Sequence, residues 1–294
     1  MEALGTFLLN FLMGFVNLAL LPWHIYNWVM LDTLKKKMNA LTMAGMSIEF
    51  FFMVVALVLI VIGIGILRRS FLRKAVYGLE TFNGRIGRFA AWFALLMTLQ
   101  QVAIIAVGQI FRGNEILISP LGISFMTEEL QWLSGQLKFY NTILIALASA
   151  YTFIEGGHVR VDLVYASCKK RTKHWIDLLG TLFFFIPSTV MLWWFAWPIT
   201  MNAMFAQKPL NIWSTSARWR DFRFETSGTA EFSWVWTFKF MVLVFAAFMF
   251  ICAIGFLLRN ILALLQKDED IPTHYSFDDE QAGDMGTEAP AHPL

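Results

Sequence analysis

Six long apolar blocks constrain this chain more than any other feature of its sequence. A helix needs roughly 20 apolar residues to cross the hydrocarbon core of a bilayer, because unpaired backbone groups cannot be left in lipid. The six blocks are about that long or longer, and they cover residues 4–28, 48–67, 89–111, 133–153, 176–205 and 234–258. The sequence therefore predicts an all-α fold, a polytopic helical membrane protein with up to six spans.

The overall composition agrees with this class. The chain is 57% hydrophobic and 15% charged, with a mean hydropathy of +0.58, whereas a soluble domain has about 25% charged residues. The first block is the weakest, because Asn10, Asn17, Pro22 and His24 interrupt it. It also differs from a cleavable signal peptide, since no basic region precedes it and its apolar run is longer than usual. We expect it to remain in the mature protein.

The distribution of lysine and arginine between the predicted loops indicates the orientation, because cytoplasmic loops carry an excess of both. The segments 68–88 and 155–177 hold eleven of these residues and fall on one side of the membrane. The loops on the other side hold eight, including Lys35, Lys36 and Lys37. This excess predicts that the first side, with both chain termini, is cytoplasmic.

Several function classes find no support in the sequence. It has no P-loop, no HExxH and no GxSxG motif, and its five histidines are not spaced with carboxylates or cysteines as metal ligands would be. A net charge of +2 is too small to suggest a nucleic-acid partner. We therefore expect no enzymatic activity, no cofactor, no metal and no nucleic-acid binding.

A few polar residues lie inside the predicted spans. Gln100 and Gln101 fall within the third block and Asn141 within the fourth. Hydrogen bonds between helices are the preferred explanation, because polar side chains commonly join membrane helices. The alternative is a free-standing channel, or a membrane subunit of an enzyme complex, in which these side chains line a cavity.

The segment between the fourth and fifth blocks looks more specified than an ordinary loop. Two glycines are followed by His158, Arg160 and Asp162, which alternate with two valines. The glycines can end the fourth span, and in extended backbone the three polar side chains share one face. A well-capped basic turn would by itself explain the charges of this segment. It explains less well the complete sequence Gly-Gly-His-Val-Arg-Val-Asp.

Short motifs in a fixed order connect this chain to a known family. They are Glu128-Glu129, His158-Val-Arg-Val-Asp162, Arg171-Thr-Lys-His-Trp-Ile-Asp-Leu-Leu-Gly180, Phe183-Phe-Phe-Ile-Pro187, Trp197-Pro198, Glu225 with Ser227, and Trp236 with Lys239. Together they resemble the small membrane subunit of tripartite ATP-independent periplasmic (TRAP) transporters, the DctQ family. The resemblance covers residues 84–264 and is closest to the branch labelled for mannitol or chloroaromatic compounds.

The resemblance implies an organisation and a function. It implies a four-span DctQ-like core over residues 84–264, preceded by an extension of two apolar helices over residues 1–83. The remaining residues 265–294 are acidic, and we expect a disordered tail. The implied function is to brace the large permease subunit (DctM-type) in a heterodimer of the bacterial inner membrane. Such a transporter takes up an organic acid or similar solute, delivered by a periplasmic solute-binding protein, by symport with an ion such as sodium.

Two groups of residues become candidates for contacts with partners. We expect His158, Arg160 and Asp162 to lock the cytoplasmic turn and to contact the large subunit. We expect Glu128, Glu129, Lys239 and the loop over residues 210–232 to lie on the outer face, where the loaded binding protein docks. Trp236 is a further candidate for a structural or partner contact. Membrane lipids are the remaining expected partner.

Overall fold

The structure is a computed structural model that describes residues 2–110, 112–113, 115–118, 126–154, 168–211, 214–222, 224–229 and 231–265. In the described part of the chain, five helices are long and apolar enough to cross a membrane, or six if one bent pair counts as a span. The expected class, an all-α polytopic membrane protein, is confirmed.

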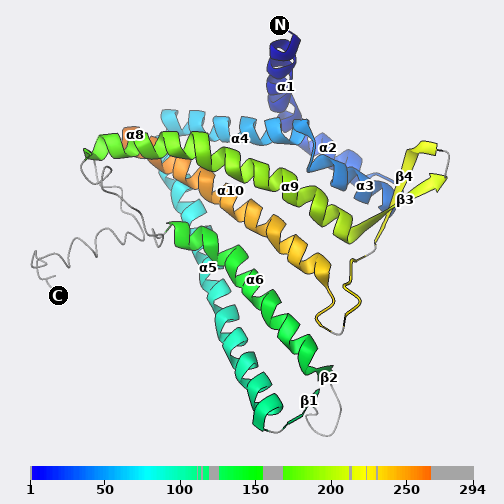
Figure 1. The fold of residues 1–294 in the computed structure, drawn as a ribbon. Helices are drawn as coiled ribbons and strands as arrows, with labels where there is room; N and C mark the ends of the chain where they lie inside the picture. Colours follow the sequence, from blue (N-terminus) through cyan, green and yellow to red (C-terminus); the bar gives the residue numbers. More distant parts are fainter. Residues whose placement is uncertain are drawn as a thin grey trace, which may run out of the picture.

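Most of the helices follow the apolar blocks of the sequence, but residues 34–44 and 69–88 are helical although they lie outside the blocks. The helices are α1 (Glu2–Ala19), α2 (Leu21–Val29), α3 (Leu34–Ala44), α4 (Ile48–Leu67), α5 (Arg69–Ile105), α6 (Leu130–Ile154), α8 (Lys170–Gly180), α9 (Ile186–Met204) and α10 (Val235–Leu265). Short π-helical turns extend α5 over Ala106–Ile110 and join α8 to α9 over Thr181–Phe185. Figure 1 shows α9 and α10 side by side, with α5 and α6 as a second pair that diverges from them.

The first apolar block forms a broken helix. Helices α1 and α2 meet at an angle of 67°, and Pro22 stands in the first turn of α2. Proline lacks the backbone N–H that would continue the hydrogen bonding of α1, so a break at this position is expected. Helix α1 packs against α4, where Gly14 lies directly against the backbone of Phe52.

The expected loop over residues 68–88 is wrong, because this segment is helical. After Arg68, helix α5 begins at Arg69 and, with its π-helical end, continues to Ile110 as one helix of 42 residues. Asn83, Gly87 and Ala90 are among its buried residues, and this three- to four-residue spacing is that of a packed helix face. At 1.5 Å per residue such a helix is about 60 Å long, roughly twice the thickness of the hydrocarbon core.

Two β-hairpins lie in the connections between helices. Strands β1 (Glu115–Ile118) and β2 (Met126–Glu129) precede α6, and strands β3 (Phe205–Asn211) and β4 (Ser214–Phe222) follow α9. Both hairpins are antiparallel, and β4 also contacts α3. The sequence predicts outer loops at both places, over residues 112–131 and 207–233. The hairpins stand outside the helix bundle and leave its class unchanged.

Tryptophan side chains of α9 hold the end of α3. Trp197 Nε1 donates to the backbone oxygen of Thr42 at 2.9 Å, and Trp193 Nε1 donates to that of Gly45 at 3.1 Å. The last carbonyls of a helix have no partner within the helix, so these indoles supply the missing donors. Gly45 lies so close that a Cβ atom there would be 2.1 Å from the Trp197 ring.

We therefore expect Trp197→Phe to loosen α3. The ring remains, but the buried Thr42 carbonyl loses its donor, which costs about 1–3 kcal/mol. The purified variant should unfold at a lower temperature and be cut faster by protease near α3. Trp194→Phe is the matched control, because the Trp194 ring is 41% exposed and packs on Phe51. Equal effects of the two substitutions would contradict this role of the Trp197 indole.

Candidate functional site

Some of the candidate residues indicated by the sequence lie within the described part of the chain, and others lie outside it. His158, Arg160 and Asp162 lie outside the described residues. Glu128 and Glu129 belong to β2, where they pair with Ile116 and Glu115 of β1 immediately before α6 begins. Lys239 and Trp236 lie in the first turns of α10, at the end of the bundle that also carries the hairpins.

An ion pair joins α10 to the segment that follows β4. Lys239 Nζ lies 2.5 Å from Glu225 Oε2, and the two side chains are 33% and 44% exposed. The backbone N–H of Glu225 donates to the carbonyl of Ala203 at 2.9 Å, and Thr200 Oγ1 donates to the carbonyl of Lys239 at 2.9 Å. The end of α9 therefore orients both partners of the ion pair.

Aromatic packing holds the same segment in place. The rings of Trp236 and Phe224 lie 4.7 Å apart, and the Trp236 backbone N–H donates to the Glu225 carbonyl at 3.4 Å. Glu225, Trp236 and Lys239, which the sequence motifs indicated separately, are thus brought together by the fold.

A second ion pair lies on α6 at this end of the bundle. Lys138 Nζ is 3.1 Å from Glu231 Oε2, and both side chains are more than half exposed. Next to it, Phe232 stacks on Phe139 and lies against Gly135. No signal in the sequence indicated that Lys138 pairs with Glu231.

We call Lys138, Glu225, Glu231, Trp236 and Lys239 the end surface. Its four charges form two pairs of opposite sign. Exposed ion pairs contribute only about 0–1 kcal/mol to folding, so stability alone gives little reason for these charges. A surface with exposed charges of both signs and an aromatic ring can instead recognise a protein by complementary charge.

One of the polar residues inside the predicted spans, Gln100, forms hydrogen bonds between helices. Gln100 Nε2 donates to the Leu133 carbonyl at 2.9 Å and to Gln136 Oε1 at 3.1 Å, which joins α5 to α6. The preferred explanation, hydrogen bonding between helices, is confirmed for Gln100. Gln101 and Asn141 are both exposed on the isolated chain.

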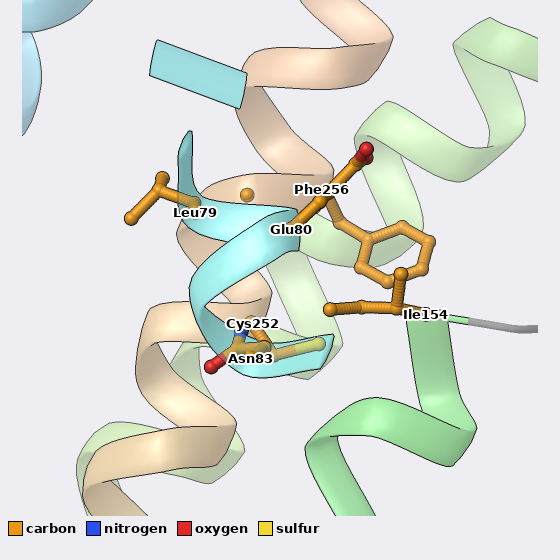
Figure 2. Close-up of a pocket in the computed structure, with 7 residues that line it drawn as sticks. Leu79, Glu80, Asn83, Ile154, Cys252 and Phe256 are labelled. Carbon is orange, nitrogen blue, oxygen red and sulfur yellow. The ribbon is translucent and has the colours of Figure 1, made fainter. Parts of the chain in front are cut away.

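A buried polar cluster lies at the opposite end of the bundle. Arg259 Nη1 of α10 is 3.3 Å from Glu80 Oε1 of α5, and their side chains are 19% and 13% exposed. The neighbouring Asn83 is 1% exposed. Figure 2 shows Glu80 and Asn83 on the same helix beside a small cavity. The sequence predicts a loop over residues 68–88, so it does not indicate that Glu80 and Asn83 contact other helices.

Among the described residues, no group of three or more histidine, cysteine, aspartate or glutamate side chains could hold a metal ion.

Residues 121–263 match the family described as "Tripartite ATP-independent periplasmic transporters, DctQ component". The match covers α6, α8, α9 and α10 and begins after α5, so it spans just under half of the chain. It supports the resemblance to the DctQ family and does not distinguish the mannitol or chloroaromatic branch. Neither a curated protein nor a solved structure matches the chain.

Proposed function

We propose that this chain is the small membrane subunit of a TRAP-type secondary transporter. It braces a large permease subunit of the DctM type in a heterodimer, and a periplasmic solute-binding protein delivers the substrate. The transport is ion-coupled symport, with sodium the expected ion and an organic acid or similar compound the expected solute. The family match over residues 121–263 is the single observation that carries the proposal.

The polar contacts of the bundle are consistent with a bracing role. Ionisable residues inside a membrane span often mark an ion pathway when they face a water-filled cavity. Here Glu80 is paired with Arg259 and Gln100 is engaged between α5 and α6. Both contacts join helices to one another, which is what a rigid brace requires.

The proposed organisation keeps the three parts expected from the sequence. Residues 1–83 form an N-terminal extension, residues 84–264 the four-span core, and residues 265–294 a tail that lies outside the described residues. Helix α5 runs through positions 83 and 84 without a break, so the extension is joined rigidly to the core. We further propose a multi-pass inner-membrane protein with both termini in the cytoplasm.

A pull-down in mild detergent tests the proposed function. The tagged full chain should recover one large permease in equal amount when the two are co-expressed. A chain that purifies alone and conducts ions in a bilayer would overturn the proposal in favour of a channel. Recovery of a soluble enzyme in place of the permease would favour a membrane subunit of an enzyme complex.

We also propose that His158, Arg160 and Asp162 lock the cytoplasmic turn before α8. Arg160 and Asp162 would pair with each other or with the large subunit. Arg160→Ala and Asp162→Ala should then reduce co-purification of the permease and uptake of the solute. Lys74→Ala, an exposed substitution on α5, is the control. Unchanged co-purification and uptake in both variants would count against the lock.

The end surface, together with Glu128 and Glu129, is our proposed docking site for the loaded binding protein. Lys239→Glu and Glu225→Lys each turn this ion pair into a pair of like charges. Each reversal should weaken docking by about tenfold at low salt. The loss should shrink as salt rises, because exposed charges are screened. Lys74→Glu, at the other end of the bundle, is the matched control. Docking that is indifferent to both charge reversal and salt would contradict this assignment.

A further inference from the structure

Asn83 is a buried polar side chain with unmet hydrogen bonds. Its Nδ2 and Oδ1 atoms are both buried, and neither has a hydrogen-bond partner among the described residues. The side chain is 1% exposed, so neither bulk water nor a partner protein can reach it. A buried amide without partners is costly, so something should bond to it.

A small cavity adjoins this side chain. It is lined by Leu79, Glu80 and Asn83 of α5, Ile154 of α6, and Cys252 and Gly255 of α10. In Figure 2, Asn83 and Cys252 lie next to each other, and Ile154 lies beside the sulfur of Cys252. Its volume is about 10 Å³, which is room for a single water molecule.

The lining favours water over a cation. The Asn83 amide presents both a donor and an acceptor, as a bridging water requires. Cys252 Sγ already donates to the Ala150 carbonyl at 3.7 Å, and in Figure 2 the Glu80 carboxylate points away from Asn83. A bound cation needs several oxygen ligands. The lining offers few, and the charge of Arg259 lies 3.3 Å from Glu80.

We propose that this cavity is a binding site for one ordered water molecule, hydrogen-bonded to the Asn83 amide. The water lies between α5 and α10, on the helices that the Glu80–Arg259 ion pair also joins. It satisfies a side chain that the protein atoms alone leave unpaired. The inference does not depend on the proposed transport function, because it concerns only how these helices are joined.

The sign of a stability change distinguishes a hydrated cavity from a dry one. Asn83→Leu should lower the unfolding temperature of the full chain in nanodiscs, because leucine removes the partner of the water. If the cavity were dry, the same substitution would remove an unpaired buried amide and fill space. The unfolding temperature would then rise, and this result would overturn the proposal.

A second variant tests the site without touching a polar side chain. Gly255→Ala adds a methyl group whose only neighbour within 4 Å is Leu79 Cβ, at 3.9 Å, so it fits and reduces the cavity. Gly78→Ala, at an open position of α5, measures the gain from helix propensity alone. We expect Gly255→Ala to raise the unfolding temperature less than Gly78→Ala does. An equal or larger rise would indicate a dry cavity.

Direct detection completes the experiment. Water-edited solid-state NMR of the asparagine-labelled full chain should show magnetisation transfer from water to the Asn83 side-chain amide. The resonance is assigned by its loss in Asn83→Leu. Absence of transfer to that amide would overturn the proposal, whatever the outcome of the pull-down.

Discussion

Replacing Arg259 with methionine is expected to destabilise the folded chain by about 3–5 kcal/mol. The substitution leaves the Glu80 carboxylate, 13% exposed, without the guanidinium that lies 3.3 Å away. A carboxylate that is largely shielded from water and has lost its opposite charge is penalised by its desolvation. Glu80→Leu should cost a similar amount, because it leaves Arg259 without its carboxylate.

The double variant Glu80→Leu with Arg259→Met separates this explanation from simple loss of packing. Both charges are then gone, and apolar replacement of a buried ion pair is often close to neutral. The double variant should therefore be more stable than either single one. Thermal unfolding of the purified full chain measures all three. A double variant as unstable as the sum of the two single ones would show that the pair does not act as a unit.

The exposed ion pair of Lys138 and Glu231 provides the control for these three variants. Lys138→Met removes a charge whose pair with Glu231 is more than half exposed, and it should change stability by less than about 1 kcal/mol. An equally large loss from Lys138→Met would show that the assay reports charge loss in general.

Gly87→Ala has the second large expected effect. Gly87 lies where α5 meets α6, and a Cβ atom there would be 2.2 Å from Tyr151 Cβ and 2.5 Å from its Cγ. These atoms are close to the backbone of α6 and cannot turn aside, so the two helices must separate. Overpacking of this kind costs roughly 1–3 kcal/mol. Small residues at such contacts are what allow membrane helices to approach closely.

Thermal unfolding of the purified variant checks this prediction. Gly78→Ala on the same helix meets no atom within 4 Å, and it should be neutral or stabilising, because alanine is the better helix former. Shortening Tyr151 to alanine should not rescue Gly87→Ala, since the closest contact is with Cβ. Full rescue by that change, or a Gly87→Ala variant as stable as Gly78→Ala, would contradict the predicted clash.

The positions of the spans could be predicted from the sequence because transfer of a helix into lipid depends on a window of consecutive residues. The block at 48–67 agrees with α4 at both ends. The many basic residues of segment 69–88 favour a loop, but the segment is helical. Charge excludes a segment from lipid, but it does not prevent helix formation in water, so the two properties have to be judged separately.

The candidate site was only partly predictable for a related reason. Short motifs indicated Glu225, Trp236 and Lys239, and the structure brings them into contact. Nothing local indicated that Lys138 pairs with Glu231, 93 positions away. The buried pair of Glu80 and Arg259 is separated by 179 positions, and its members lie on helices whose relative rotation no single apolar block reveals.

The sequence by itself determined the class of this protein, the approximate places of its spans and the resemblance to a transporter subunit, because these depend on runs of neighbouring residues. Only the tertiary structure decided which polar groups meet: the indoles of α9 at the end of α3, the two ion pairs of the end surface, and Asn83 beside a water-sized cavity. Such meetings depend on how helices far apart in the chain are rotated against one another. Side-chain packing sets that rotation, and the packing is complete only when all the helices are in place.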